Sequence, residues 1–157
     1  MAMGTFTVFD TVTLWEADGT DILKATNTFK MILDLSADAL TSSSASLYSN
    51  IANEVANGNG YTTGGVTLTG VSITRAGAVT TFTWTGPNPD WTASGSGIPA
   101  WRWMVVYVSG TINGHVSPLV GFCLGDGTNI DVPLTPSGTP ITILPSGSGL
   151  IQISHSP

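Results

Sequence analysis

Two acidic turns are the first candidates for chemistry in this sequence of 157 residues. Residues 16–21 (Glu-Ala-Asp-Gly-Thr-Asp) and 126–131 (Asp-Gly-Thr-Asn-Ile-Asp) each place several oxygen-bearing side chains around a glycine. Hard cations such as Ca²⁺ take about six to eight oxygen ligands of this kind. Neither segment has the EF-hand spacing, and Asx turns, in which an aspartate caps its own turn, account for both. We therefore expect no metal site and no cofactor.

Nucleophilic and acid–base catalysis need groups that the sequence does not bring together. A serine or cysteine nucleophile needs a basic histidine and an orienting carboxylate, but His115 lies in a glycine-rich loop and His155 near the end. Glycoside hydrolysis needs two carboxylates across a cleft. Asp34, Glu54 and Asp90 are scattered over different elements, and the sequence cannot pair them. We therefore predict that the chain is not an enzyme.

The charge balance restricts the partners. Four Lys and Arg residues stand against ten Asp and Glu, which gives a net charge of −6. Nucleic acids and anionic lipids are bound by rows of basic residues, so neither is an expected partner. No apolar stretch approaches the roughly 20 residues that span a bilayer, and the first residues lack the pattern of a secretory signal. We expect a soluble protein made in the cytoplasm, with the lone Cys123 as a small buried thiol.

Tryptophans are the remaining candidates for binding. Trp84, Trp91, Trp101 and Trp103 lie close together in the sequence, and exposed tryptophans can stack on sugar rings. Strand parity instead predicts core or interface packing for Trp84, Trp101 and Trp103. Only Trp91 lies in an obvious loop, so a carbohydrate-binding module stays open as an alternative. We take Trp91, Trp101 and Trp103 as a candidate interaction surface.

Most of the sequence has the period of strands. Residues 80–84 alternate apolar and polar side chains, as in a half-buried strand. In residues 101–108 apolar side chains occupy both faces, with Trp101 and Trp103 on the same one. This predicts a central strand covered on both sides, by the chain itself or by a partner subunit. Further strands are expected at 28–35, 66–68, 71–73, 119–124, 141–143 and 151–153.

Turns, a bulge and a short helix between the strands complete the expected fold. Gly70 predicts a β-bulge at Thr69-Gly70, residues 75–78 and 145–149 predict turns, and 11–17 predicts a short helix capped by Asp10 or Thr11. Roughly eight short strands favour one all-β domain over 1–157, an antiparallel β-sandwich or jelly-roll-like fold with little helix. An N-terminal arm covers about 1–27, and a C-terminal tail about 154–157. The expected core comprises Phe29, Met31, Leu33, Val66, Leu68, Ile73, Phe82, Trp84, Val105, Tyr107 and Phe122.

One glycine-rich turn stands out before the strand at 66–68. Gly64 and Gly65 are interpreted as positions where a positive φ or a close backbone approach excludes a Cβ atom. Tyr61 is expected to pack its ring over the sheet edge and to tie down the loop with its hydroxyl. We predict that Gly60, Tyr61, Gly64 and Gly65 form a structural turn.

The stretch from Asn53 to Leu68, with Asn53-Glu54-Val55 followed by Gly58-Asn59-Gly60-Tyr61-Thr62-Thr63-Gly64-Gly65, resembles a segment of small tailed-bacteriophage virion proteins. These are capsid decoration, head-fibre or minor tail proteins. Looser likenesses continue at 27–33, 83–85, 102–107 and 118–121, so that the resemblance covers about Phe6 to Ile153.

The resemblance implies a non-enzymatic structural role in the virion and assembly in many copies. The leading expectation is a capsid decoration or cement protein on the outside of a phage head, bound to the major capsid protein or other virion proteins. A tail-associated or head-fibre component is the alternative. Self-association is also expected, because so few charges protect the sheet edges. The resemblance implies that the assembly is a homotrimer.

Overall fold

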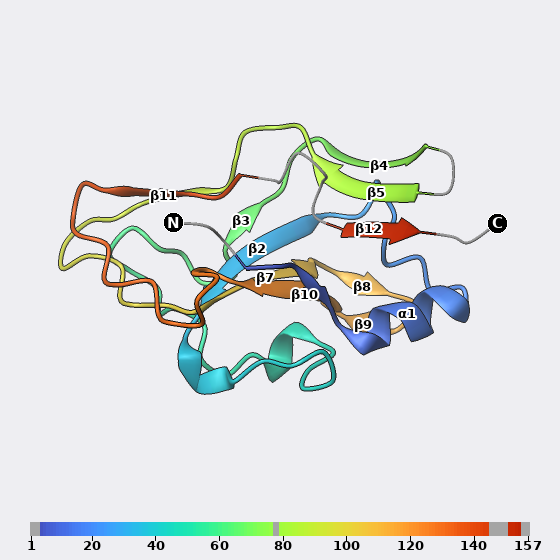
Figure 1. Ribbon diagram of the computed structural model, residues 1–157, viewed down its shortest axis with the longest axis horizontal. Helices are drawn as coiled ribbons and strands as arrows, with labels where there is room; N and C mark the ends of the chain where they lie inside the picture. Colours follow the sequence, from blue (N-terminus) through green and yellow to red (C-terminus); the bar gives the residue numbers. More distant parts are fainter. Residues whose placement is uncertain (1–3, 77–78, 145–150, 155–157) are drawn as a thin grey trace.

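Two antiparallel sheets packed face to face form the body of the molecule (Figure 1). The computed structural model describes residues 4–76, 79–144 and 151–154. In the central sheet the strands lie in the order β1-β10-β7-β2-β3 and every neighbouring pair is antiparallel. The predicted all-β fold is confirmed. The central strands are β1 (Thr7–Val8), β2 (Phe29–Asp34), β3 (Val66–Thr67), β7 (Trp103–Val108) and β10 (Leu119–Leu124).

Smaller sheets and turns surround this one. A second sheet of three strands, in the order β12-β5-β4, lies above it in the view of Figure 1. The pairs β11-β6 and β8-β9 form two further small sheets. The remaining elements are β4 (Val71–Ala76), β5 (Val79–Trp84), β6 (Asp90–Thr92), β8 (Thr111–Ile112), β9 (His115–Val116), β11 (Pro140–Thr142), β12 (Ile151–Ser154), the helix α1 (Asp10–Ala17) and the 3₁₀ turns η1 (Ser36–Asp38) and η2 (Tyr48–Asn50).

The chain itself covers both faces of β7, which answers the question left open by the sequence. Met104, Val106 and Val108 pack with Phe29 of β2 and Phe82 of β5 on the side of the second sheet, which we call the sandwich face. On the opposite side, the loop face, the strand side chains pack beneath residues 35–51 and the start of α1. The buried members of this second cluster are Phe9, Val12, Ile32, Leu40, Ala45, Trp103, Val105, Tyr107, Leu119 and Phe122.

Trp101 lies on a different side from the one predicted. It belongs to the cluster on the sandwich face, whereas Trp103 lies on the loop face. The alternation fails because β7 begins only at Trp103, and Trp101 forms an isolated bridge with Val132 instead.

Nine of the eleven expected core side chains are buried, and the two exceptions share a cause. Val66 and Ile73 are only half-buried. Val66 belongs to the two-residue strand β3 at the edge of the central sheet, and Ile73 to the outer strand β4 of the second sheet. An edge strand has a neighbour on one side only, so that parity alone overestimates how deeply its side chains are buried.

The expected bulge at Thr69-Gly70 is wrong, because the chain changes sheets there. β3 pairs with β2 in the central sheet, whereas β4 pairs with β5 in the second sheet. Gly70 lies between them with φ +63°, and a Cβ atom there would approach Gly86 N at 2.8 Å. The parity shift in the sequence therefore marks a crossing between two sheets, for which glycine supplies the left-handed backbone.

Residues 4–27 contribute four apolar side chains to the core. Phe9, Val12, Trp15 and Ile22 are all buried. The predicted helix is present as α1, but neither Asp10 nor Thr11 caps it: Phe9 holds the cap position, and no side chain caps the helix. The Phe9 ring at this position is fully buried. Of the turn expected at 75–78, Arg75 and Ala76 belong to β4. Residues 77–78, the turn expected at 145–149 and His155 lie outside the described residues.

Candidate functional site

The glycine-rich motif lies along the edge of β2 that β3 leaves uncovered. β3 pairs only with Lys30 and Met31 of β2. Beyond them, Val55 N–H donates to the carbonyl of Leu33 at 3.0 Å. The N–H of Leu33 has no strand opposite it and donates to the hydroxyl of Tyr61 at 3.1 Å. A phenol thus completes the hydrogen bonding of a sheet edge, which satisfies a backbone group that is expensive to bury unpaired.

Glu54 is the centre of the polar contacts at this edge. Its Oε1 accepts from the hydroxyl of Tyr61 and from the amide of Gly64, both at 2.7 Å. Its Oε2 accepts from the hydroxyl of Tyr48. The hydroxyl of Tyr107 donates to the carbonyl of Gly64 at 2.9 Å. We call the group Tyr48, Glu54, Tyr61, Gly64 and Tyr107 the tyrosine clasp.

Ring stacking adds an apolar component to the clasp. Tyr48 and Tyr107 stack on the loop face, with centroids 4.6 Å apart and an interplanar angle of 16°. Tyr61 lies on the sandwich face and stacks on Trp91 at 6.0 Å. The clasp therefore reaches both hydrophobic clusters around one sheet edge, and it joins the motif segment to η2 and β7.

The protonation chemistry of the clasp opposes catalysis by its phenols. Burial raises the pKa of Tyr61 and of Tyr48, and the Glu54 carboxylate adds to both effects. The same two causes raise the pKa of Tyr107 to about 12. Nucleophiles and general bases that work near neutral pH need a lowered phenol pKa. Because all three hydroxyls also take part in hydrogen bonds, the arrangement suits cohesion of the fold.

The glycines of the motif are fixed by the backbone. Gly60, Gly64 and Gly65 have φ values of +90°, +86° and +67°. A Cβ atom on Gly65 would overlap the carbonyl of Met31, and one on Gly60 would overlap the carbonyl of Thr92. At Gly64 the nearest atom, the Tyr107 hydroxyl, would be 3.6 Å away. Gly65 thus meets both conditions that the sequence suggested, whereas Gly64 meets only the positive φ.

The three tryptophans of the expected interaction surface lie inside the protein. Trp91 is 3% exposed, Trp101 3% and Trp103 9%. The placement of Trp91 in an exposed loop is wrong, because its residue belongs to β6, which pairs with β11. Pairing with β11 and stacking on Tyr61 turn its ring into the core. None of the three side chains offers an open ring face to a sugar.

Two of the three scattered carboxylates come together in space. Asp34 at the end of β2 forms an isolated antiparallel bridge with Glu54. Asp90 lies apart on β6, where its Oδ1 accepts from the hydroxyl of Thr142 at 2.8 Å. Asp34 carries a signal that sequence reasoning missed, because it shares the phase of Ile32, a core residue of the same strand. A carboxyl group at a core phase is rare without a specific reason.

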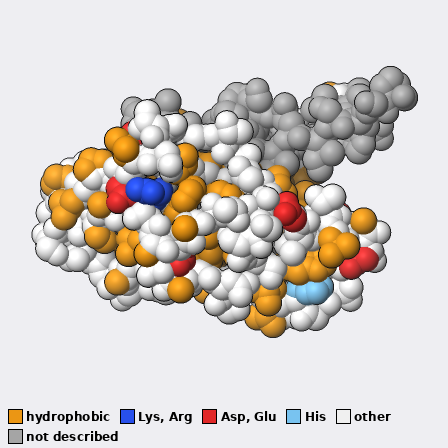
Figure 2. All heavy atoms as spheres, turned by 60° about the horizontal axis from the view of Figure 1, so that its bottom comes forward, with side chains coloured by type: hydrophobic (Ala, Val, Ile, Leu, Met, Phe, Trp, Pro, Cys, Tyr) orange, Lys and Arg blue, Asp and Glu red, His pale blue; other side chains and the backbone are white. Residues whose placement is uncertain are grey.

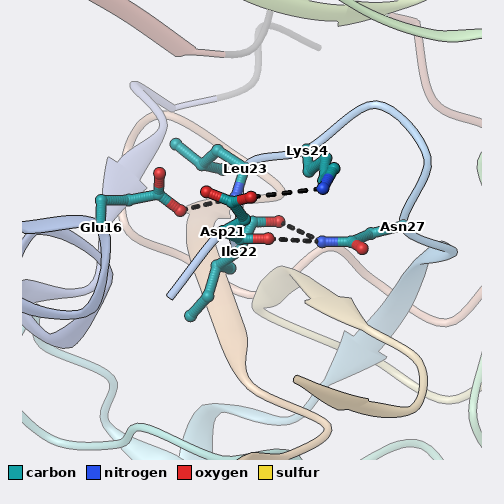
Figure 3. A network of polar contacts seen from close by, with 6 residues as sticks. All are labelled: Glu16, Asp21, Ile22, Leu23, Lys24 and Asn27. Carbon is teal, nitrogen blue, oxygen red and sulfur yellow. Dashed lines mark hydrogen bonds and ion pairs between the residues drawn. The ribbon is translucent and has the colours of Figure 1, made fainter. Parts of the chain in front are cut away.

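In both acidic turns an aspartate accepts hydrogen bonds from a threonine of the same turn. Asp18 Oδ1 accepts from the amide and hydroxyl of Thr20, and Asp126 Oδ1 does the same with Thr128. Figure 3 shows the rest of the first turn: Glu16 accepts from the amide of Leu23 at 2.7 Å, and Asp21 pairs with Lys24 at 3.3 Å. No three His, Cys, Asp or Glu side chains are placed to hold a metal ion together in the described part of the chain.

The remaining reactive side chains are also engaged in packing. His115 stacks on Trp15 with centroids 4.2 Å apart. Cys123 is buried, and burial raises the pKa of its thiol to about 12. A thiol with so high a pKa is a poor nucleophile.

Comparisons of the chain with protein-family models, with curated proteins and with solved structures found no match. No helix among the described residues is long and apolar enough to cross a membrane.

Proposed function

We propose that the chain is a structural protein of a tailed-phage virion, a decoration protein bound to the outside of the head. The observation that carries the proposal is the state of its reactive side chains. Glu54 and the three tyrosines of the clasp, His115 and Cys123 are all engaged in hydrogen bonding or packing. These side chains stabilise the fold, and a stable fold is what a scaffold or binding protein requires.

The sequence resemblance gives the proposal its class. The segment 53–68, which carries the likeness to virion proteins, is the segment that closes the edge of β2 through the clasp. A motif with this architectural role is expected in a family that shares a fold and an assembly rather than a reaction. The burial of Trp91 removes the reason for the carbohydrate-binding alternative.

Exposed apolar side chains supply possible contacts with other virion proteins. Leu14 on α1 and Val116 on β9 are 64% and 61% exposed, and Ile130 and Leu134 are 57% and 52% exposed. Figure 1 shows α1 and β9 at one end of the molecule, and the connection between β10 and β11 toward the other. Figure 2 shows hydrophobic side chains scattered over this surface, with few basic ones among them.

The test is the location and copy number of the protein in purified particles, measured by cryo-electron microscopy. Hundreds of copies on the head lattice are the expected result. A few copies at one vertex would indicate the tail or fibre role instead, and absence from particles would overturn the proposal.

Two double variants locate the contact. One double variant carries Leu14→Ser and Val116→Ser at one end of the molecule. The other carries Ile130→Ser and Leu134→Ser toward the other end, so that each replaces two exposed apolar side chains by serine. Binding of each purified variant to heads that lack the protein is measured. Loss of binding with one pair only is expected, and unchanged binding with both would exclude these side chains as the contact.

A further inference from the structure

Asp34 is a buried carboxyl group beside the tyrosine clasp, but it takes no part in the hydrogen bonds of the clasp. Its side chain is 0% exposed at the end of β2. Neither of its carboxyl oxygens has a hydrogen-bond partner among the described residues. Trp103 lies directly opposite Asp34 on β7, and its indole N–H also has no partner there. An ionised carboxylate in such a place would be a buried charge without compensation.

The two neighbouring acids are in the opposite situation. Asp38 Oδ2 accepts from the amides of Ala52 and Asn53, at 2.9 and 3.0 Å. Glu54 accepts from two hydroxyls and one amide within the clasp. Both neighbouring acids therefore have several hydrogen-bond donors, whereas Asp34 between them has none among the described residues.

No cation forms an ion pair with Asp34 in the part of the chain that the structure describes. Arg102 donates its backbone amide to the carbonyl of Asp34, but its Nε pairs with Asp131 at 2.7 Å. Lys30, on the same strand, places its Nζ near Gly64. The amide of Leu35, which favours ionisation of Asp34, donates to the carbonyl of Asn53 at 3.0 Å. Asp38 is therefore the strongest charged influence on Asp34, and Glu54 acts in the same direction with a smaller effect.

We infer that Asp34 keeps its proton in the folded chain and thereby makes the closure of residues 36–65 over β2 dependent on pH, tight in acid and looser in base. This device is independent of the proposed virion role. Burial, and after it the negative charge of Asp38, raises the pKa of Asp34 from 3.8 to about 8. Glu54 acts in the same direction.

The sign of the effect follows from proton linkage. When the segment opens, Asp34 meets water and titrates near its ordinary pKa of 3.8. Between that pH and about 8 the open form has lost a proton that the closed form keeps. The opening constant therefore rises with pH, by up to about tenfold per pH unit in this window, and levels off above it. Closure is complete below the lower value and weakest above the upper one.

Hydrogen exchange measured by NMR tests the coupling. The reporter amides are Val55, which donates to Leu33, and Gly64, which donates to Glu54. Opening constants, corrected for the intrinsic exchange rate, are measured from pH 5 to pH 8. In the unmodified chain they are expected to rise by up to about tenfold per pH unit. In Asp34→Asn they are expected to stay constant, while the control Asp10→Asn, which removes an exposed carboxylate, keeps the rise.

A direct titration decides the case even where Asp34→Asn does not fold. The carboxyl ¹³C shift of Asp34 is followed against pH in the unmodified chain. A midpoint near 8 supports the inference, and a midpoint near 4 overturns it. Opening constants that do not change with pH would also overturn it, because the proton would then have no influence on the segment.

Discussion

The two faces of the central sheet are closed by different means. On the sandwich face the cover is another sheet, and Phe29 meets Phe82 with centroids 4.9 Å apart. On the loop face the cover is the irregular segment 35–51 with the start of α1. A sheet pairs its own backbone groups, so that an apolar face is sufficient to dock it. An irregular segment must find partners for its amides among side chains, which is why Asp38, Glu54 and the clasp gather at its end.

The largest effect is expected from the apolar side of this comparison. Phe82 is 2% exposed and its ring packs edge-on against Phe29. Phe82→Ala should lower the free energy of unfolding by about 3–5 kcal/mol, since it removes transfer energy and leaves a cavity. Urea denaturation measures the loss, and the exposed Leu134→Ala, expected within about 0.5 kcal/mol of the parent, is the control. A loss below about 1 kcal/mol would show that the second sheet contributes little to this face.

A smaller effect is expected at the motif, where two adjacent glycines form a matched pair. Gly65→Ala combines a positive φ with overlap against the Met31 carbonyl, and should destabilise by about 3 kcal/mol. Gly64→Ala carries only the φ penalty, roughly 1–2 kcal/mol, because the nearest atom would be 3.6 Å away. Chemical denaturation of both variants checks the order. Equal midpoints would mean that the close approach to β2 does not determine the turn.

The smallest loss of stability is expected when single hydroxyl groups of the clasp are removed, and two such variants can be compared. Tyr61→Phe removes the acceptor of Leu33 N–H and a donor to Glu54, and should lower stability by about 1–3 kcal/mol. Tyr107→Phe removes only the donor to the Gly64 carbonyl, and should lower it by about 1 kcal/mol. Thermal and urea unfolding compare them, with both rings retained. If Tyr107→Phe is the more harmful, completion of the β2 edge is not the main role of the clasp.

The sandwich face could be predicted from the sequence because it follows parity. Phe29, Met31 and Leu33 share a face, and β5 opposes them with Phe82 and Trp84. The pairing of β7 with β10 and of β4 with β5 also follows from the alternation and the short connections. The positive φ values at Gly64 and Gly65 could be anticipated for a similar reason, since few other residues adopt them.

Parity predicts the burial of Val105, Tyr107 and Phe122, but the segment that covers the loop face and the partners within the clasp could not be predicted, because these contacts join residues far apart in the chain. Tyr107 meets the motif across 43 positions, and Tyr61 meets Leu33 across 28. The role of Glu54 depends on these long-range contacts, and no local pattern reveals it. The core phase of Asp34 is a local signal of its burial, but the acids around it come from distant segments. The sequence predicts a bulge at Gly70 instead of a crossing, because a change of sheet and a bulge shift parity in the same way.

The hydrogen bond between the Leu33 amide and the Tyr61 hydroxyl has a consequence for solubility. β2 is a largely buried strand with four apolar residues, in a chain of which only 9% is charged, and such segments can template fibrils when their edge is open. Charged side chains often protect edges of this kind, and here the Tyr61 hydroxyl occupies the Leu33 amide, which would otherwise be available to an incoming strand. The clasp therefore also serves as protection against aggregation. Conditions that open it should shorten the lag time of fibril formation well before they unfold the sandwich.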